Sequence, residues 1–171
     1  MYLQVVQCLI IILWIWNDCK KLRRFKFIVD MIYNIEKKDL FKVDFDEYAP
    51  AHCISADCKM GAGIAVPIRK KFSLGNMSND VDRMLLRPGV AVYYHKVYNL
   101  ITKEKYWHKP TYDTIEAALA SMYYHAKEHG MEKIVMPKIG SGLDQLSWPK
   151  VEDIIMDIFK DLDIKILVCY L

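Results

Sequence analysis

The order of apolar and polar positions predicts alternating strands and helices through most of this chain. Short runs rich in β-branched and apolar residues, typical of strands, occupy residues 31–35, 49–55, 90–101, 133–136 and 164–170. The run at 90–101 is long enough for a hairpin that turns near His95 and Lys96. Covered strands that alternate with helices predict an α/β fold, a three-layer α/β/α sandwich around a mixed, mostly parallel sheet.

Helices are expected between these strands. Apolar residues recur at helical spacing in residues 114–128, where Asp113 is the expected N-cap and Gly130 the expected stop. A helix over 149–160 would begin with Pro149, whose missing N–H costs little in a first turn. Two further helices, one over 64–71 and a short one over 80–86, complete the prediction.

A glycine-containing loop lies between the strand at 49–55 and the helix at 64–71. Gly61 and Gly63 leave the backbone uncovered just before that helix, whose last turn carries Arg69, Lys70 and Lys71. The N-terminus of a helix presents unpaired N–H groups and a partial positive charge, which favour a phosphate or pyrophosphate. A Gly-Ala-Gly turn also occurs where a helix packs closely on a strand, and this loop alone does not separate the two interpretations.

A second glycine loop, residues 136–148, follows the strand at 133–136 and precedes the last helix. Strand ends at one edge of an α/β sheet share a crevice, so the two loops can converge on one diphosphate. The chain contains neither G-x-x-x-x-G-K-[ST] nor G-x-G-x-x-G. A P-loop nucleotidase and a Rossmann dehydrogenase are therefore not expected.

Charge separates the N-terminal thirty residues from the rest. The 171-residue chain carries a net charge of +3. Residues 1–30 contain five Lys or Arg and two Asp, whereas residues 31–171 contain 19 basic and 19 acidic side chains. The balanced body gives no strong signal for nucleic-acid binding.

The five cysteines have no spacing typical of a metal site or of a disulfide framework. We therefore expect packing thiols, no metal, and a reducing compartment such as the cytoplasm or nucleus.

The apolar run at the N-terminus is too short for a simple membrane span. Residues 3–16 are almost all apolar and a basic cluster follows, but spanning a bilayer takes about 18–20 residues. Three interpretations stay open: a marginal signal-anchor, an extra element packed on the domain, or translated upstream sequence with Met31 as the working start. We favour the last, which divides the chain into an extension, 1–30, and a single domain, 31–171.

Three segments together resemble the macrodomain family. They are HCISADCKMGAGIAVPIRKKF at 52–72, LITKEKYWHKPTY at 100–112 and MPKIGSGLDQLSW at 136–148. The resemblance is closest to the branch that contains terminal ADP-ribose protein glycohydrolase, and it extends from Met31 to Leu171. It implies a domain that binds ADP-ribose and ADP-ribosylated proteins, with no cofactor, and we expect a monomer.

The resemblance also implies roles for individual residues. Lys103 and Asp144 match the catalytic pair of the glycohydrolase branch, and Asp39 matches an aspartate that contacts the adenine amino group. On residue chemistry alone, Lys103 is more simply interpreted as a solvated loop lysine, and Asp39 is also compatible with a helix N-cap. The expected ADP-ribose-binding residues are Asp39, Leu40, Ser55, Gly61, Ala62, Gly63, Ile64, Ile139, Gly140, Ser141, Gly142 and Leu143.

The predicted function is removal of mono-ADP-ribose from ester-linked acceptors, glutamate or aspartate on proteins and also O-acetyl-ADP-ribose. Lys103 would be the nucleophile and Asp144 the acid and base, since an unprotonated amine attacks an anomeric carbon readily. Three alternatives stay open: an ADP-ribose 1″-phosphate phosphatase, a non-catalytic reader of ADP-ribosylated proteins, and removal of ADP-ribose from DNA bases.

Overall fold

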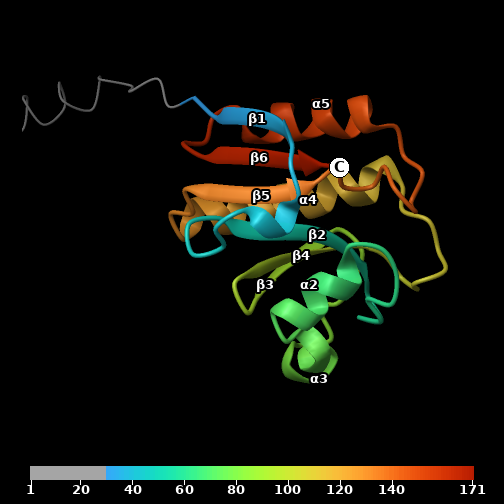
Figure 1. Cartoon of the computed structure of the whole chain (residues 1–171). Helices are drawn as coiled ribbons and strands as arrows, with labels where there is room; N and C mark the ends of the chain where they lie inside the picture. Colours follow the sequence, from blue (N-terminus) through green and yellow to red (C-terminus); the bar gives the residue numbers. More distant parts are fainter. Residues whose placement is uncertain (1–29) are drawn as a thin grey trace, which may run out of the picture.

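The computed structural model describes residues 30–171, which form one α/β domain (Figure 1). The predicted extension, residues 1–30, lies almost entirely outside the described residues, so the three interpretations of its apolar run stay predictions. Within them, no helix is long and apolar enough to cross a bilayer. The strands are β1 (Ile32–Lys37), β2 (Ala49–Ser55), β3 (Val90–Tyr94), β4 (Val97–Lys103), β5 (Lys133–Pro137) and β6 (Lys165–Tyr170); the helices are α2 (Ala65–Lys71), α3 (Met77–Asp80), α4 (Tyr112–Glu128) and α5 (Trp148–Phe159), with short 3-10 turns at Leu40–Lys42 and Leu74–Asn76.

The six described strands form one mixed sheet in the order β1-β6-β5-β2-β4-β3. Every neighbouring pair is parallel except β3 and β4, which form the predicted antiparallel hairpin. Its two turn residues, His95 and Lys96, both have positive φ angles, 48° and 66°. Positive φ at both positions is typical of the tight turns that suit the twist of a hairpin. The predicted mixed, mostly parallel sheet is confirmed.

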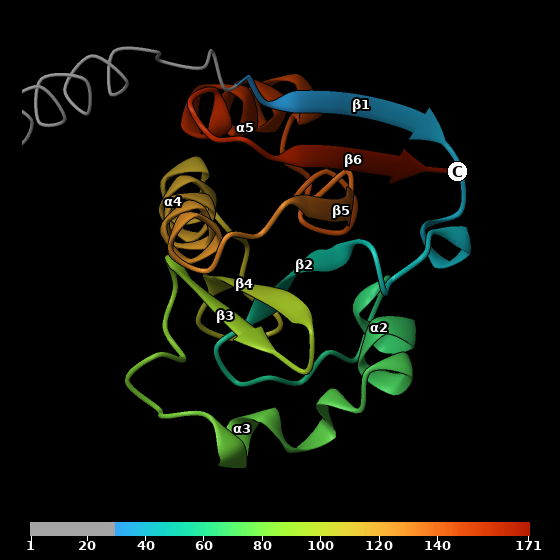
Figure 2. The ribbon, with the colours of Figure 1, turned by 90° about the vertical axis from the view of Figure 1, so that its left-hand side faces the viewer.

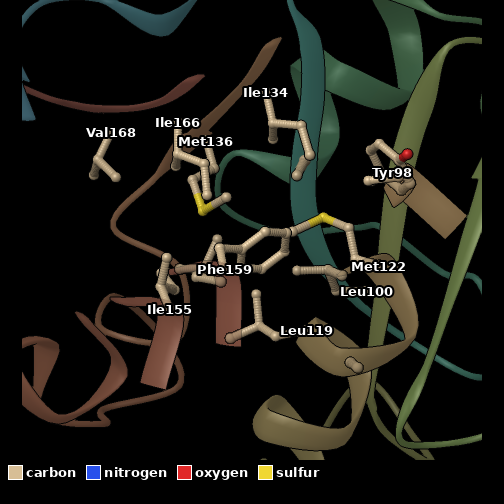
Figure 3. Packing of buried hydrophobic residues seen from close by; sticks show 14 of the residues in the cluster. Tyr98, Leu100, Leu119, Met122, Ile134, Met136, Ile155, Phe159, Ile166 and Val168 are labelled. Carbon is tan, nitrogen blue, oxygen red and sulfur yellow. The ribbon is translucent and has the colours of Figure 1, made fainter. Parts of the chain in front are cut away.

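Helices cover both faces of the sheet, which confirms the three-layer sandwich (Figure 2). Helices α4 and α5 pack on one face, where Met122 and Phe159 are fully buried against strand residues such as Leu100 and Met136 (Figure 3). Helix α2 and the turns around it cover the other face through Ile68, Leu74 and Met77. Burying such aliphatic side chains stabilises the domain by about 1.5–3 kcal/mol each.

Two helix predictions need correction. The short helix is α3, Met77–Asp80, and not 80–86, because Val81 adopts an extended conformation (φ −100°, ψ 137°) that ends it. Helix α4 begins at Tyr112, and its N-cap is Thr111 and not Asp113. The Thr111 hydroxyl accepts from the Thr114 N–H and the Thr114 hydroxyl accepts from the Thr111 N–H, so each satisfies a backbone donor of the other.

The topology brings the carboxyl ends of five parallel strands to one edge of the sheet. Strands β2 and β4 are adjacent, with Ser55 opposite Lys103 in the register. Strand β5 lies on the other side of β2 and leads into the second glycine loop. Crevices at such strand ends are where open α/β sheets bind ligands.

Candidate active site

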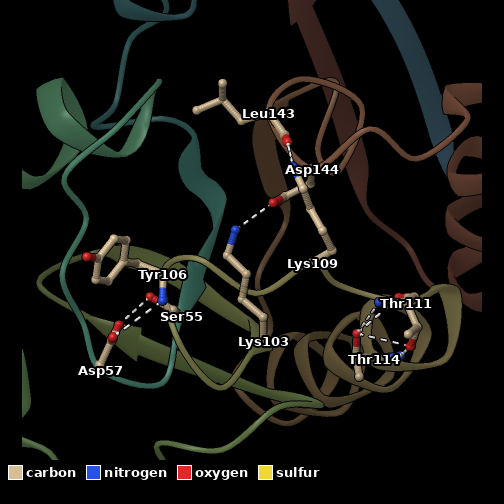
Figure 4. Close-up of polar contacts among 9 residues, drawn as sticks. All are labelled: Ser55, Asp57, Lys103, Tyr106, Lys109, Thr111, Thr114, Leu143 and Asp144. Atoms are coloured by element: carbon tan, nitrogen blue, oxygen red, sulfur yellow. Dashed lines mark hydrogen bonds and ion pairs between the residues drawn. The ribbon is translucent and has the colours of Figure 1, made fainter.

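A cavity of about 480 Å³ opens at the carboxyl ends of β2, β4 and β5. Its walls are the β2–α2 loop, the β4–α4 loop and the β5–α5 loop, so three segments far apart in sequence meet there (Figure 4). The volume lies within the range of small-molecule sites. Nine of the residues predicted to bind ADP-ribose line this cavity, as do both predicted catalytic residues: Ser55, Gly61, Ala62, Gly63, Ile64, Ile139, Gly140, Gly142, Leu143, Lys103 and Asp144.

The β2–α2 loop reaches the cavity through a series of unusual backbone conformations. Cys58, Met60 and Gly63 have positive φ angles of 52°, 44° and 57°. Residues 61–64 are all exposed and line the cavity just before α2 begins at Ala65. The loop therefore brings exposed backbone and the N-terminal end of α2 to the cavity wall, as the glycine pattern predicts.

The β5–α5 loop turns sharply at Gly140, which has φ +73°. The Ile139 N–H donates to the Pro137 carbonyl (2.7 Å) and the Leu146 N–H to the Gly140 carbonyl (2.9 Å). Leu143 extends from this loop to the other glycine loop, where its Cδ1 lies 3.3 Å from the position that a Cβ on Gly63 would occupy. The two glycine loops therefore meet across the cavity.

Lys103 and Asp144 form an ion pair inside the cavity. The Lys103 Nζ lies 2.5 Å from Asp144 Oδ1, and the two side chains are only 15% and 13% exposed. Lys103 comes from the end of β4 and Asp144 from the β5–α5 loop, 41 residues later. A charge-assisted hydrogen bond in a site that largely excludes water holds both groups in fixed positions.

The β4–α4 loop supplies cavity residues that the sequence did not single out. Tyr106 and Trp107 line the cavity with His108 and Lys109. Lys109 Nζ also donates to the Leu143 carbonyl, which ties this loop to the second glycine loop. Two adjacent aromatic residues in an otherwise polar loop were the available signal. His108 lies in the same wall.

Asp57 connects the β2–α2 and β4–α4 loops. Its Oδ1 accepts from the Ser55 hydroxyl (2.5 Å), and its Oδ2 accepts from the Tyr106 N–H (3.3 Å) (Figure 4). The Ser55 hydroxyl is therefore held at the strand end by a neighbouring carboxylate, and Ser55 itself is almost fully buried.

The charge of the lining favours an anionic ligand. Three lysines (Lys103, Lys109 and Lys138) line the cavity with one aspartate, Asp144, which gives a net charge of +2. Cys53 also lines it, but burial raises the pKa of its thiol to about 12, with a further contribution from the Asp144 charge. A thiol with so high a pKa is not a nucleophile at neutral pH, which agrees with a packing role.

Three predicted binding residues do not line this cavity. Asp39 caps the 3-10 turn after β1, where its Oδ1 accepts from the Phe41 N–H (3.0 Å), and the neighbouring Leu40 is buried in the core. The Ser141 hydroxyl donates to the Lys138 carbonyl (2.7 Å) and holds its own loop. The helix-cap interpretation of Asp39 is confirmed, and its contact with adenine stays a prediction. Within residues 30–171 no group of three potential ligands is arranged for a metal ion.

The Macro domain family matches residues 52–155, which include all three walls of the cavity. This chain is a macrodomain. Over 121 residues it is 43% identical to the human protein named ADP-ribose glycohydrolase OARD1, an alignment that covers 69% of this chain and 78% of the human one.

Solved macrodomains share the fold. The macrodomain of Mycobacterium tuberculosis DarG superposes with a TM-score of 0.72 at 19% identity, covering 81% of this chain and 97% of that chain. Thermosipho africanus DarTG, solved in complex with ADP-ribose, superposes with a TM-score of 0.68 at 16% identity, covering 81% of this chain and 41% of that one.

Proposed function

We propose that this macrodomain is a hydrolase that releases ADP-ribose from ester-linked acceptors, chiefly glutamate or aspartate side chains of proteins. The observation that carries the proposal is the Lys103–Asp144 pair in the wall of the cavity between the two glycine loops. Binding alone requires neither side chain, whereas hydrolysis requires a nucleophile and a proton carrier. The human and bovine relatives are both named ADP-ribose glycohydrolase, which supports the same reaction class.

The diphosphate of ADP-ribose would lie between the two glycine loops. The exposed backbone of residues 61–64 and the loop at 139–143 face each other across the cavity, and the surplus positive charge of Lys109 and Lys138 favours two phosphates. This position leaves the distal ribose at the ends of β2 and β4, beside Ser55 and Lys103. The anomeric carbon, which carries the ester, would then face the ion pair.

The reaction follows from the pairing of the two side chains. In the resting pair, Lys103 is an ammonium and Asp144 a carboxylate, so the lysine must first transfer a proton to Asp144 to become a nucleophile. Lys103 Nζ then bonds to the anomeric carbon as the carbon–oxygen bond to the acceptor breaks, and the acceptor leaves as a carboxylate. The adduct opens to a Schiff base on the ribose carbon. Addition of water and loss of the lysine amine release ADP-ribose, with Asp144 carrying the protons.

The experiment is multiple-turnover release of ADP-ribose from three substrates: a glutamate-modified protein, O-acetyl-ADP-ribose and ADP-ribose 1″-phosphate. We expect wild type to release ADP-ribose and Lys103→Ala to lose at least a hundredfold in kcat with binding of free ADP-ribose retained. The matched control is Lys160→Ala, which breaks an exposed Lys–Asp pair with Asp157 (2.7 Å) outside the cavity. Retained turnover in Lys103→Ala would contradict the proposal, and turnover of ADP-ribose 1″-phosphate alone would favour a phosphatase.

A further inference from the structure

Two large, adjacent aromatic side chains at the cavity are exposed to solvent. Tyr106 is 58% and Trp107 62% exposed, and their rings meet edge to face with centroids 4.7 Å apart. Both line the catalytic cavity. Exposing two rings together forgoes the free energy of burying them, and such aromatic groups beside a site are typical of residues that contact a partner or ligand.

The loop does not depend on these rings for its conformation. The Tyr106 N–H donates to Asp57 Oδ2, and the His108 N–H donates to the Lys105 carbonyl (2.9 Å). Asp57 is held in turn by the Ser55 hydroxyl. Hydrogen bonds from the backbone N–H groups of the loop therefore hold the segment that carries the rings. The rings themselves are available for a ligand.

The position of the two rings suits contact with the acceptor and not with the diphosphate. They follow Lys103, the last residue of β4, by three and four residues, whereas the diphosphate is assigned to the two glycine loops. The acceptor is bonded to the carbon that Lys103 attacks. A group attached to that carbon therefore lies near the end of β4, where the loop that carries the two rings begins.

A second hollow of about 350 Å³ is lined by the first two residues of the same loop. Glu104 and Lys105 line this hollow, together with Asp57 and Arg83, whereas Tyr106 and Trp107 line the catalytic cavity. The β4–α4 loop therefore lines both hollows, the catalytic cavity through the aromatic pair and the second hollow through Glu104 and Lys105. The two acidic and two basic side chains of the second hollow suit the mixed donors and acceptors of a polypeptide, whereas nucleic-acid phosphates would meet two carboxylates.

We propose that Tyr106 and Trp107 form an acceptor platform, on which the polypeptide flanking an ADP-ribosylated glutamate or aspartate packs as it extends toward the second hollow. The inference rests on the proposed function. It makes Trp107 a specificity-determining residue, which favours protein acceptors over small esters. Truncating an exposed aromatic anchor at an interface commonly weakens binding by about tenfold or more.

The test compares three substrates in wild type, Tyr106→Ala, Trp107→Ala and the double variant: a glutamate-ADP-ribosylated peptide, O-acetyl-ADP-ribose and an ADP-ribosylated single-stranded oligonucleotide. We expect the double variant to lower the ratio of peptide to small-ester kcat/KM at least tenfold. The matched control is Tyr124→Ala, which truncates an exposed aromatic residue on α4 outside the cavity and should leave this ratio unchanged. An unchanged ratio in the double variant would overturn the platform, as would a selective loss of the oligonucleotide reaction.

A binding measurement keeps the inference testable if wild type hydrolyses neither ester. In that case the proposed function fails, and the affinity of the modified peptide is compared with that of free ADP-ribose. The platform predicts that wild type binds the modified peptide more tightly and that Trp107→Ala removes that advantage. Equal affinities of wild type for the two ligands would overturn it.

Discussion

Gly140 lies so close to Ile115 of α4 that a Cβ at this glycine would stand 2.6 Å from the Ile115 Cδ1. Ile115 is 1% exposed in the core, and Gly140 has φ +73°, a conformation that strains other residues. Gly140→Ala should lower the free energy of unfolding by about 2–3 kcal/mol through the contact and the left-handed backbone. Urea unfolding measures this. Gly142→Ala is the matched control, because no atom lies within 4 Å of its added Cβ, and an equal loss there would contradict the account.

The N-cap of α4 gives a second prediction. Thr111→Ala removes the hydroxyl that accepts from the Thr114 N–H (3.2 Å), so stability should fall by about 1 kcal/mol. Asp113→Ala removes only a favourable charge in the first turn and should cost a few tenths of a kcal/mol. Thermal unfolding of the two variants distinguishes them. A larger loss from Asp113→Ala would mean that Asp113 is the cap after all.

Buried His52 makes stability depend on pH. Its Nε2 pairs with the Asn99 Oδ1 (2.9 Å), and burial lowers its pKa from 6.5 to about 4. Between these values the unfolded chain binds the proton and the folded one does not, so stability falls as the pH drops from about 6.5 to 4 and this contribution then levels off. The difference in pKa corresponds to about 3 kcal/mol.

The measurement is urea unfolding of wild type and His52→Gln at pH 7 and pH 4. Glutamine can still donate to Asn99 but does not titrate, so the variant isolates the histidine from the carboxylates that also respond to acid. We expect wild type to lose about 3 kcal/mol more than the variant over this interval. Equal losses would show that His52 is not the group responsible.

The resemblance to the macrodomain family implied that Lys103 and Asp144 form a pair, and they meet because the carboxyl ends of β4 and β5 lie at the same edge of the sheet. The strand and loop pattern predicted that the two glycine loops would face one cavity. Details that depend on contacts between distant segments could not be predicted. The Tyr106 N–H donates a hydrogen bond to Asp57 Oδ2, and the two residues are 49 positions apart in the sequence. No local sequence pattern predicts that contact.

Local patterns also failed where two neighbouring residues offer the same chemistry. Thr111 and Asp113 are both good N-cap residues two positions apart, and the structure shows that Thr111 is the cap, paired with Thr114 by two hydrogen bonds. Similarly, an aromatic pair in a loop could be core or surface. Only the assembled structure shows that Tyr106 and Trp107 stay exposed beside the cavity.

The most direct test of the central claim is to trap the covalent intermediate on Lys103. Wild type would be mixed with a glutamate-ADP-ribosylated protein and sodium borohydride, which reduces a Schiff base to a stable secondary amine, and the modified lysines would be identified by peptide mass spectrometry. The account predicts an ADP-ribose adduct on Lys103, absent from the exposed Lys160 and lost in Lys103→Ala. Hydrolysis at the normal rate with no adduct on Lys103 would contradict a lysine nucleophile.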